Sequence, residues 1–436
     1  MNTVAFDPAA ALVDHPLRRE LNDEIHARPF EAIAAPSALS YLVYLNRNCN
    51  LEQELWLVGQ LCAHFSCTPP AAGAIQFSCN LGPVRFRWAR HGEFSAITLI
   101  CGAVTGQPFA DSPRNHVPAE WLAQLPRNIL LAVEVTLLPE SALAADVETI
   151  SAAYFAGNDL VGAQIAEGAG LAFTDFRIHA DGCSRYLLID KRMGPRQSGR
   201  MLQRFLEIDT YRMMACLTLP LAKSLQPELA KTDSELAELT TAMPKARQED
   251  EPALLDQLTQ LAARIESALS RTDSRFSAAR AYYEIVERRI RELRELRIAG
   301  TQPFSEFVAR RLLPAMETCE SVARSQRILA KRVSRASALL RTRVDVSREK
   351  QNQQLLASMN RRAHLQLRLQ ETVEGLSVAA ITYYTVGLVG YAAKGLKTAG
   401  VHLEPELITG IAIPVVAICV ALGLRRMRKT LARKHQ

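Results

Sequence analysis

The sequence predicts an α+β cytoplasmic head with a mainly antiparallel sheet, a long coiled-coil-like α-helical stalk and a C-terminal transmembrane hairpin of two helices. Three observations predict this class: short strand-like runs are confined to the first 190 residues, helical periodicity follows them, and two uncharged apolar runs lie near the C-terminus. We therefore divide the 436 residues into a head (1–197), a stalk (198–374), two membrane helices with a short external loop (375–424) and a basic cytoplasmic tail (425–436).

The head combines strands and helices. Five runs rich in β-branched or aromatic residues predict strands, at Leu39–Leu45, Val84–Arg90, Phe94–Ile100, Ile129–Leu138 and Tyr186–Ile189. A helix at Leu51–Phe65 interrupts them, and an earlier helix opens after Asp14 and stops before Pro29. We interpret Gly162, Gly168 and Gly170 as turn residues. This order predicts a mainly antiparallel sheet.

The stalk begins where strand signals end, at Ser198. Helices are expected from Leu254 to Arg297 and from about Ala315 to Glu374, the second running without Pro or Gly into the first apolar run. Apolar residues recur at heptad spacing, as Phe276, Tyr283 and Ile290, as Ala279, Val286 and Leu293, and as Val322, Leu329, Val333, Ala336 and Leu340. The pattern predicts an antiparallel helical hairpin and a homo-oligomer formed through the stalk.

Two uncharged apolar runs, Gly375–Ala393 and Leu407–Leu424, predict a membrane anchor. Each has about the length that a helix needs to cross a hydrocarbon core of roughly 30 Å. The alternative is a pair of buried core helices, which the basic clusters flanking both runs disfavour. The first residues of the sequence carry neither a basic region nor a long apolar core, so we expect no secretory signal there.

Basic residues flank the two runs and predict their orientation. The positive-inside rule places the large N-terminal part and the tail in the cytoplasm, with the short loop outside. The flanking residues that are candidates for contact with anionic lipid, and hence with the lipid bilayer as a partner, are Arg361, Arg362, Arg368, Arg425, Arg426, Arg428 and Lys429.

Charge is divided unevenly along the chain. Residues 1–270 carry a net charge of −9 and residues 271–374 carry +10, while the last twelve residues contain six basic groups and no acid. A nucleic-acid-binding domain has a basic patch, so the acidic first half argues against a nucleic-acid partner. The nine cysteines are scattered, and in a reducing cytosol we expect free thiols.

A polar cluster is the candidate site of the head. If residues 90–93 continued a strand, His91 and Glu93 would lie on one face, and Asp175, Arg177, His179 and Asp181 would likewise share one side of a second strand. Such a cluster could bind an anion or act in acid–base catalysis, or it could be an ion-pair network that holds the sheet to the first helix. The candidate residues are His26, Arg28, Arg90, His91, Glu93, Asp175, Arg177, His179 and Asp181.

Metal and cofactor motifs are not found in the sequence. Cys62 and Cys67, with Cys49 and Cys79 nearby, match no standard zinc spacing, and buried cysteine is a common small apolar residue. Walker A, zinc-protease, nucleophile-elbow and dinucleotide-binding signatures do not occur. We therefore expect no metal and no cofactor.

Several motifs resemble those of a bacterial membrane-anchored family catalogued as domain of unknown function 3422. They lie at residues 15–20 (HPLRRE), 26–31 (HARPFE), 88–94 (WARHGEF), 174–182 (TDFRIHADG), 203–212 (QRFLEIDTYR) and 383–391 (YYTVGLVGY), so the resemblance covers nearly the whole chain. It implies anchoring in the bacterial inner membrane and brings no activity with it.

Three functions remain open. The first is a non-enzymatic, oligomeric sensor or scaffold anchored in the membrane. The second is a channel or transporter, because the order of parts is similar to that of CorA-type magnesium channels, although the Gly-Met-Asn signature of that family is absent and this chain has Gly390-Tyr391 in that region. The third is an enzyme that uses the His/Arg/Glu cluster.

Overall fold

The computed structural model describes residues 15–19, 21–22, 30–102, 107–142, 146–398 and 404–433. After residue 423 it describes the backbone and, among the side chains, only that of Arg426. The chain divides into two compact units. Unit 1 comprises residues 1–242 and 256–336, and unit 2 comprises residues 243–255 and 337–436. The four-segment division predicted from the sequence stays a prediction.

Unit 1 contains a nine-stranded sheet with the order β2-β3-β4-β1-β5-β8-β7-β6-β9. All neighbours are antiparallel except β5 and β8, which are parallel, so the predicted mixed α/β fold with a mainly antiparallel sheet is confirmed. The strands are β1 (Ser37–Leu45), β2 (Gln76–Leu81), β3 (Val84–Arg90), β4 (Phe94–Cys101), β5 (Ile129–Pro139), β6 (Val161–Ile165), β7 (Gly170–Thr174), β8 (Ser184–Asp190) and β9 (Leu296–Arg297).

Helices complete both units. They are α2 (Leu51–His64), α3 (Ala119–Leu122), α4 (Val147–Tyr154), α5 (Gly194–Cys216), α6 (Leu219–Ala242), α7 (Glu251–Glu292), α8 (Phe304–Arg311), α9 (Leu313–Thr398) and α10 (Pro405–Arg433), with short 3-10 turns η1 (Pro113–His116), η2 (Glu140–Ala142) and η3 (Met243–Lys245). The sequence predicted a helix that ends before Pro29. Residues 18, 19, 21 and 22 of this segment are helical, and residues 23–29 lie outside the described ranges.

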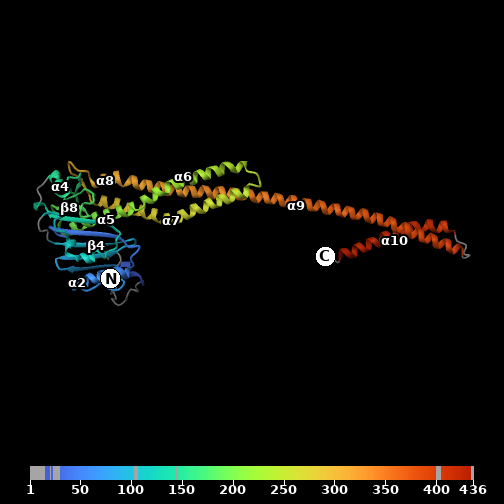
Figure 1. Ribbon diagram of the computed structural model, residues 1–436, viewed down its shortest axis with the longest axis horizontal. Coiled ribbons are helices and arrows are strands. Elements are labelled where there is room, and N and C mark those ends of the chain that lie inside the picture. Colours follow the sequence, from blue (N-terminus) through green and yellow to red (C-terminus); the bar gives the residue numbers. More distant parts are fainter. Residues whose placement is uncertain are drawn as a thin grey trace, which may run out of the picture. The chain divides into compact units, whose positions relative to one another are not determined.

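Both faces of the sheet are buried because side chains alternate along each strand. Leu39, Tyr41 and Val43 of β1 point to the face that α5, α7 and α8 cover, in the largest apolar cluster. Leu42 and Tyr44 point to the opposite face, where α2 and α3 cover the strands around β1. A third cluster lies between α4 and the strands around β8. Helices therefore lie on both sides of the sheet (Figure 1).

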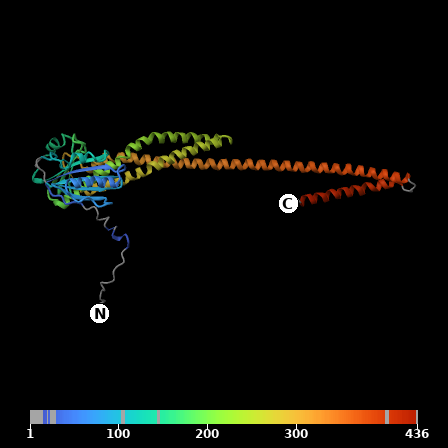
Figure 2. The same cartoon turned by 60° about the horizontal axis from the view of Figure 1, so that its bottom comes forward.

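The heptad positions of the stalk are mostly buried inside the chain itself. Phe276, Val286, Ile290 and Leu293 belong to the same apolar cluster as α5 and the sheet, together with Val322 of α9. Within unit 1, α6 and α7 run antiparallel (Figure 2). Ion pairs link these two helices to each other and both of them to α9, namely Arg264 with Glu235, Arg327 with Asp273 and Arg332 with Asp233. The periodicity thus marks the core-facing side of these helices, and a coiled coil stays a prediction.

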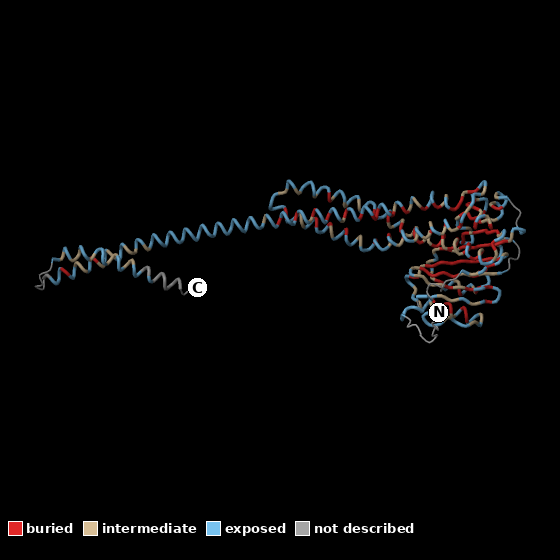
Figure 3. The backbone as a smooth tube through the Cα atoms, turned by 180° about the vertical axis from the view of Figure 1, so that it is seen from behind, coloured by how far each residue is buried: buried red, intermediate tan, exposed pale blue. Residues whose placement is uncertain are grey.

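Unit 2 has a small buried part and a long exposed one. Leu340 and Val344 are buried, and Arg343 binds the buried carboxylate of Glu251 at 2.6 Å and the Met243 carbonyl at 2.6 Å. Farther along α9 and through α10 most side chains are exposed (Figure 3). The two helices hold segments that are long and apolar enough to span a membrane. They approach closely at Gly390, where a Cβ atom would lie 3.3 Å from Thr409 Oγ1.

Candidate functional site

The turn between β3 and β4 holds part of the predicted polar cluster. The strand expected through residues 90–93 is wrong, because β3 ends at Arg90 and β4 begins at Phe94. His91 and Glu93 therefore do not share a strand face. The His91 ring instead stacks on the Phe94 ring, with 4.4 Å between centroids. The turn places Glu93 toward helices that come much later in the sequence.

Glu93 forms a junction with helix α7. Its carboxylate accepts two hydrogen bonds from Arg275 at 2.9 and 3.0 Å and one from the Tyr282 hydroxyl at 2.7 Å. Arg47 pairs with it at 3.1 Å. Burial alone would raise the pKa of Glu93, but the hydrogen bonds and the Arg275 charge outweigh burial and lower this pKa. Arg275 also donates to the Met214 carbonyl at 3.1 Å, so the junction ties the sheet to α5 and α7.

Arg90 belongs to a separate, more deeply buried group. Its guanidinium lies 2.6 Å from the carboxylate of Glu54, which is fully buried in α2. Ser95 donates a hydrogen bond to that carboxylate at about 3 Å, and Arg90 also donates to the Cys49 carbonyl at 3.1 Å. Burial raises the pKa of Glu54 in spite of these partners. This pair holds α2 against β3 and β4, which is a structural role.

The second part of the predicted cluster lies in a loop. Asp175, Arg177, His179 and Asp181 do not alternate on a strand as expected, because β7 ends at Thr174 and β8 starts at Ser184. Instead the loop folds back, and His179 Nε2 lies 3.0 Å from the Asp175 carboxylate. Asn158 donates to the same carboxylate at 2.9 Å. Arg177 is exposed.

The two parts of the cluster do not meet. Both lie at the same end of the sheet, but β4 and β7 are separated by β1, β5 and β8. Four strand spacings amount to about 19 Å, which exceeds the reach of any side-chain pair. His26 and Arg28, the remaining predicted members, lie outside the described residues. The His/Arg/Glu arrangement proposed for acid–base chemistry is therefore not assembled by the described residues.

A buried polar group around Glu134 was missed by the sequence analysis. Ser40 and Ser112 donate to the Glu134 carboxylate at 2.9 and 2.7 Å, and the Arg114 guanidinium lies 3.5 Å from it. The same guanidinium lies 3.0 Å from the sulfur of buried Cys183. The available signal was one acid within an otherwise apolar strand (ILLAVEVTLLP), since an isolated buried carboxylate requires partners.

The chemistry of this group favours a structural role. Burial raises the pKa of Glu134, and burial together with the neighbouring carboxylate raises the pKa of Cys183 to about 12. A thiol with that pKa stays protonated at neutral pH and is a poor nucleophile. Asp181, whose pKa is lowered by hydrogen bonds that outweigh burial, ion-pairs with Arg185 at 3.2 Å at the rim of the group. In this group the buried Glu134 carboxylate receives hydrogen bonds from two serines and a nearby positive charge from Arg114.

A cleft of about 1120 Å³ lies in unit 1 between α5 and the part of the sheet formed by β1, β2, β3 and β4, and Cys79 of β2 is among its lining residues. Its apolar lining includes Leu39, Tyr41, Phe94, Ala96, Ile100, Leu202, Leu206 and Tyr211, and its polar lining includes Glu31, Arg85, Arg87, His91, Gln203, Glu207 and Arg289. Arg85 and Arg87 pair with Glu31, and Arg289 pairs with Glu207. This volume, with an apolar floor and a polar rim, suits an amphipathic small molecule.

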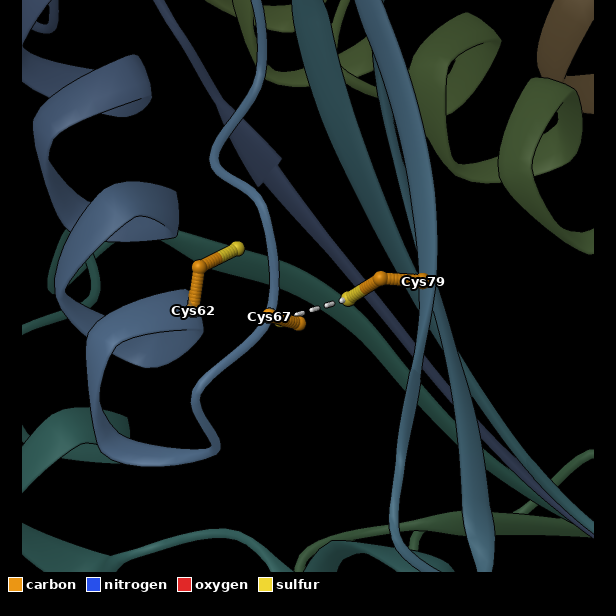
Figure 4. A group of neighbouring side chains, drawn as sticks. All are labelled: Cys62, Cys67 and Cys79. Carbon is orange, nitrogen blue, oxygen red and sulfur yellow. Dashed lines mark hydrogen bonds between the residues drawn. The ribbon is translucent and has the colours of Figure 1, made fainter.

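Three cysteines meet between the end of α2 and edge strand β2 (Figure 4). Cys62 lies near the end of α2, Cys67 in the segment after it and Cys79 on β2. Their sulfur atoms all lie within 4.8 Å of one another, and the sulfurs of Cys67 and Cys79 are 3.5 Å apart. Burial raises the pKa of Cys62 to about 12 and raises that of Cys79 as well. The sequence spacing did not predict this group, because a strand supplies the third member.

The candidate lipid-contact residues lie on the two long helices of unit 2. Arg361, Arg362 and Arg368 are exposed on α9. Arg426 is exposed on α10, and Arg425, Arg428 and Lys429 lie on the same helix with side chains outside the described set. All seven positions are therefore helical.

Comparisons with known proteins give one result for the whole chain. A family model described as "Protein of unknown function (DUF3422)" matches residues 13–431. No curated protein and no solved structure matches the chain.

Proposed function

The chain belongs to the DUF3422 family, whose function is unknown, and from its geometry we propose that it is a non-enzymatic sensor or scaffold anchored in the bacterial inner membrane. In this proposal a homo-oligomer presents the α/β unit and the basic tail to the cytoplasm, and no nucleic acid takes part. The observation that carries the sensing role is the 1120 Å³ cleft between α5 and the sheet.

Exposed apolar side chains support the anchor. Leu376, Tyr383, Tyr384 and Leu388 of α9 are each at least 70% exposed, and several large apolar side chains of α10 are more than half exposed. A contiguous apolar surface of this size is unfavourable in water and favourable in a bilayer. The basic residues that flank both spans support an orientation with the tail and the large N-terminal part inside the cell.

Thiol accessibility tests the anchor and its orientation. Thr398→Cys places a thiol at the end of α9, next to the expected external loop, and Ser358→Cys places one on the same helix before the span. A membrane-impermeant maleimide should label Thr398→Cys in intact cells and Ser358→Cys only after lysis. Labelling with the opposite sidedness would overturn the orientation, and extraction of the protein from membranes by alkaline carbonate would overturn the anchor.

The cleft supports binding of an amphipathic small molecule. Tyr41, Phe94 and Tyr211 offer aromatic surface, and Gln203 offers amide hydrogen bonds at the rim. The three arginines that line the cleft are all paired with acids, so the ligand gains more from apolar contact than from net charge.

A fluorescent probe tests the cleft in the full chain reconstituted in nanodiscs. All three tryptophans, Trp56, Trp88 and Trp121, lie in unit 1, so energy transfer from tryptophan to anilinonaphthalenesulfonate reports dye near the α/β fold rather than dye in lipid. Thr98→Phe, which fills the cleft, should at least halve the transfer. Thr241→Phe, on the exposed side of α6, should leave it unchanged. Equal transfer in both variants would contradict the sensing role.

The oligomer has support from a part of the predicted stalk that follows the heptad residues. Residues 355, 359, 369 and 373 share one face of α9 in unit 2, and their apolar side chains are more than half exposed. Light scattering of detergent-solubilised protein should give a mass above that of the monomer, and Leu369→Glu should reduce it. Gln353→Glu, on the opposite face, should not. A strictly monomeric wild-type protein would overturn this part.

The two alternatives gain no support from the geometry. The polar residues offered for catalysis lie in two groups about 19 Å apart in the described structure. The channel alternative rests on the order of parts alone, which is a weak basis for function.

A further inference from the structure

The three-cysteine group is held by local backbone structure at the end of α2. The chain reverses after His64, with Ser66 at φ +55°, and the Cys67 amide donates to the Cys62 carbonyl at 2.9 Å. This reversal directs the chain from the helix back toward the sheet. Positive φ is uncommon for serine, so the turn is maintained by its surroundings.

The third sulfur comes from the edge of the sheet. Cys79 lies on β2, the first strand in the sheet order, and its side chain packs against the apolar cluster that contains Cys62. Cys62 is buried, whereas Cys67 and Cys79 are half-buried. The group therefore has one dry side and one side that solvent can reach, which gives an ion an entry path.

The spacing of the sulfurs fits a single ion with thiolate ligands. A Zn–S bond of about 2.3 Å with tetrahedral angles places two sulfurs about 3.8 Å apart. The observed Cys67–Cys79 distance is 3.5 Å, and all three sulfurs lie within 4.8 Å of one another, so small side-chain rotations reach that geometry. A ligand set of sulfur alone selects soft ions over Mg²⁺ or Ca²⁺.

We propose that Cys62, Cys67 and Cys79 bind one soft d10 metal ion, Zn²⁺ or Cu⁺, through three thiolates. Binding releases the three thiol protons and leaves any further coordination position to water or an exogenous ligand. The ion joins the C-terminal end of α2 to edge strand β2 and covers that edge. Cys79 also lines the cleft, whereas Cys62 and Cys67 do not. The metal site does not rest on the proposed sensing function.

Cadmium titration of the full chain, fully reduced and under anaerobic conditions in detergent, tests the site. Cd²⁺ should bind with a thiolate-to-metal charge-transfer absorption that saturates at one ion per chain. Cys67→Ser and Cys79→Ser should each weaken Cd²⁺ binding at least tenfold. Cys216→Ser, a half-buried cysteine of α5 outside the group, is the matched control and should leave binding unchanged. Binding by either serine variant with wild-type affinity would overturn the proposal.

Two further measurements distinguish metal binding from misfolding and from disulfide formation. Cys67→Ser and Cys79→Ser change partly exposed positions, so thermal midpoints near that of wild type will show that a loss of binding is not a loss of folding. Zn²⁺ and Cu⁺ should each displace Cd²⁺, with loss of the absorption. If the fully reduced protein gives no such absorption and mass spectrometry instead finds a Cys67–Cys79 disulfide in the unreduced protein, the thiols form a redox pair and the metal site is wrong.

Discussion

The sheet of unit 1 and the long helices of unit 2 contain similar apolar side chains in opposite surroundings. Leu188 in β8 is completely buried by neighbouring strands and helices, whereas Leu388 in α9 is 70% exposed. In unit 1 the chain supplies its own apolar environment, with polar groups such as Glu93 and Glu134 fully partnered. In the exposed part of unit 2 that environment has to come from outside, which is the basis of the proposed anchor and oligomer.

The largest expected difference between the two regions is the loss of stability when a leucine is truncated to alanine. Leu188→Ala opens a cavity in the core and should lower the free energy of unfolding of unit 1 by about 3–5 kcal/mol. Leu356→Ala, at a site 63% exposed, should change it by less than about 0.5 kcal/mol. Urea unfolding of the detergent-solubilised chain, followed by tryptophan fluorescence, measures both because all three tryptophans lie in unit 1. Similar losses of unfolding free energy in both variants would contradict the difference between the buried and the exposed leucine.

A charge placed in the apolar segment should test the membrane side of the comparison. Leu388→Arg should cost about 2.5–3.5 kcal/mol of insertion free energy and reduce the membrane-bound fraction of the protein. Leu356→Arg is the matched control, because this leucine is comparably exposed, precedes the span and lies off the proposed oligomer face. Flotation on a density gradient measures the fraction bound. Equal retention of both variants would argue that residues 375–393 do not cross the bilayer.

The fold was predictable where the sequence pattern is local. The content of β-branched and aromatic residues predicted β3 as Val84–Arg90 with the observed bounds, and the other four predicted strands agree within two residues at each end. Strand β2 was missed because, as an edge strand, it carries exposed polar residues. Gly162 and Gly170 are not the turn residues that the sequence predicted, because they lie in β6 and at the start of β7. At Gly162 the Phe173 ring would lie 2.6 Å from a Cβ atom, which leaves no room for a side chain.

The candidate sites were predictable only in part, because their contacts are distant in sequence. Glu93 was identified as a site residue, but its main partner, Arg275, is 182 positions away, and no spacing rule links them. Asp175 and His179 do meet, although through a loop rather than a strand. The spacing of Cys62, Cys67 and Cys79 matches no standard zinc motif, so the sequence did not predict a site there. The pairing of β2 with β3 brings Cys79 beside α2, and spacing along the chain does not reveal that pairing.

The junction at Glu93 should give a smaller effect than the core truncation. Arg275→Ala removes two hydrogen bonds to the carboxylate and leaves the Met214 carbonyl without this donor, so it should cost about 2 kcal/mol. Arg280→Ala, on the exposed side of α7 where Arg280 pairs with Glu284, should cost less than about 0.5 kcal/mol. The same urea assay measures both. Equal values would show that the junction does not stabilise the fold.

The smallest expected effect is a difference in pH dependence between the buried carboxylate of Glu134 and the half-buried carboxylate of Glu93. Burial raises the pKa of Glu134 above its ordinary value of 4.5, so the folded state holds this proton more tightly than the unfolded state. The contribution of Glu134 to stability should therefore fall as pH rises from 4.5 through the folded-state pKa. Glu93 has a lowered pKa, so its contribution is present above 4.5 and is lost as pH falls below that value.

Glu134→Gln isolates the first of these contributions. The amide keeps an oxygen that accepts from Ser40 or Ser112 but does not titrate, so the variant should lose less stability than wild type between pH 4.5 and pH 7. Glu93→Gln should leave that interval unchanged and flatten the loss of stability below pH 4.5. Urea midpoints at pH 4, 5 and 7 measure the differences between each variant and wild type, in which the histidine contributions cancel. If Glu134→Gln kept the wild-type slope between pH 4.5 and pH 7, the buried carboxylate would titrate alike in both states, and burial would not be what sets its pKa.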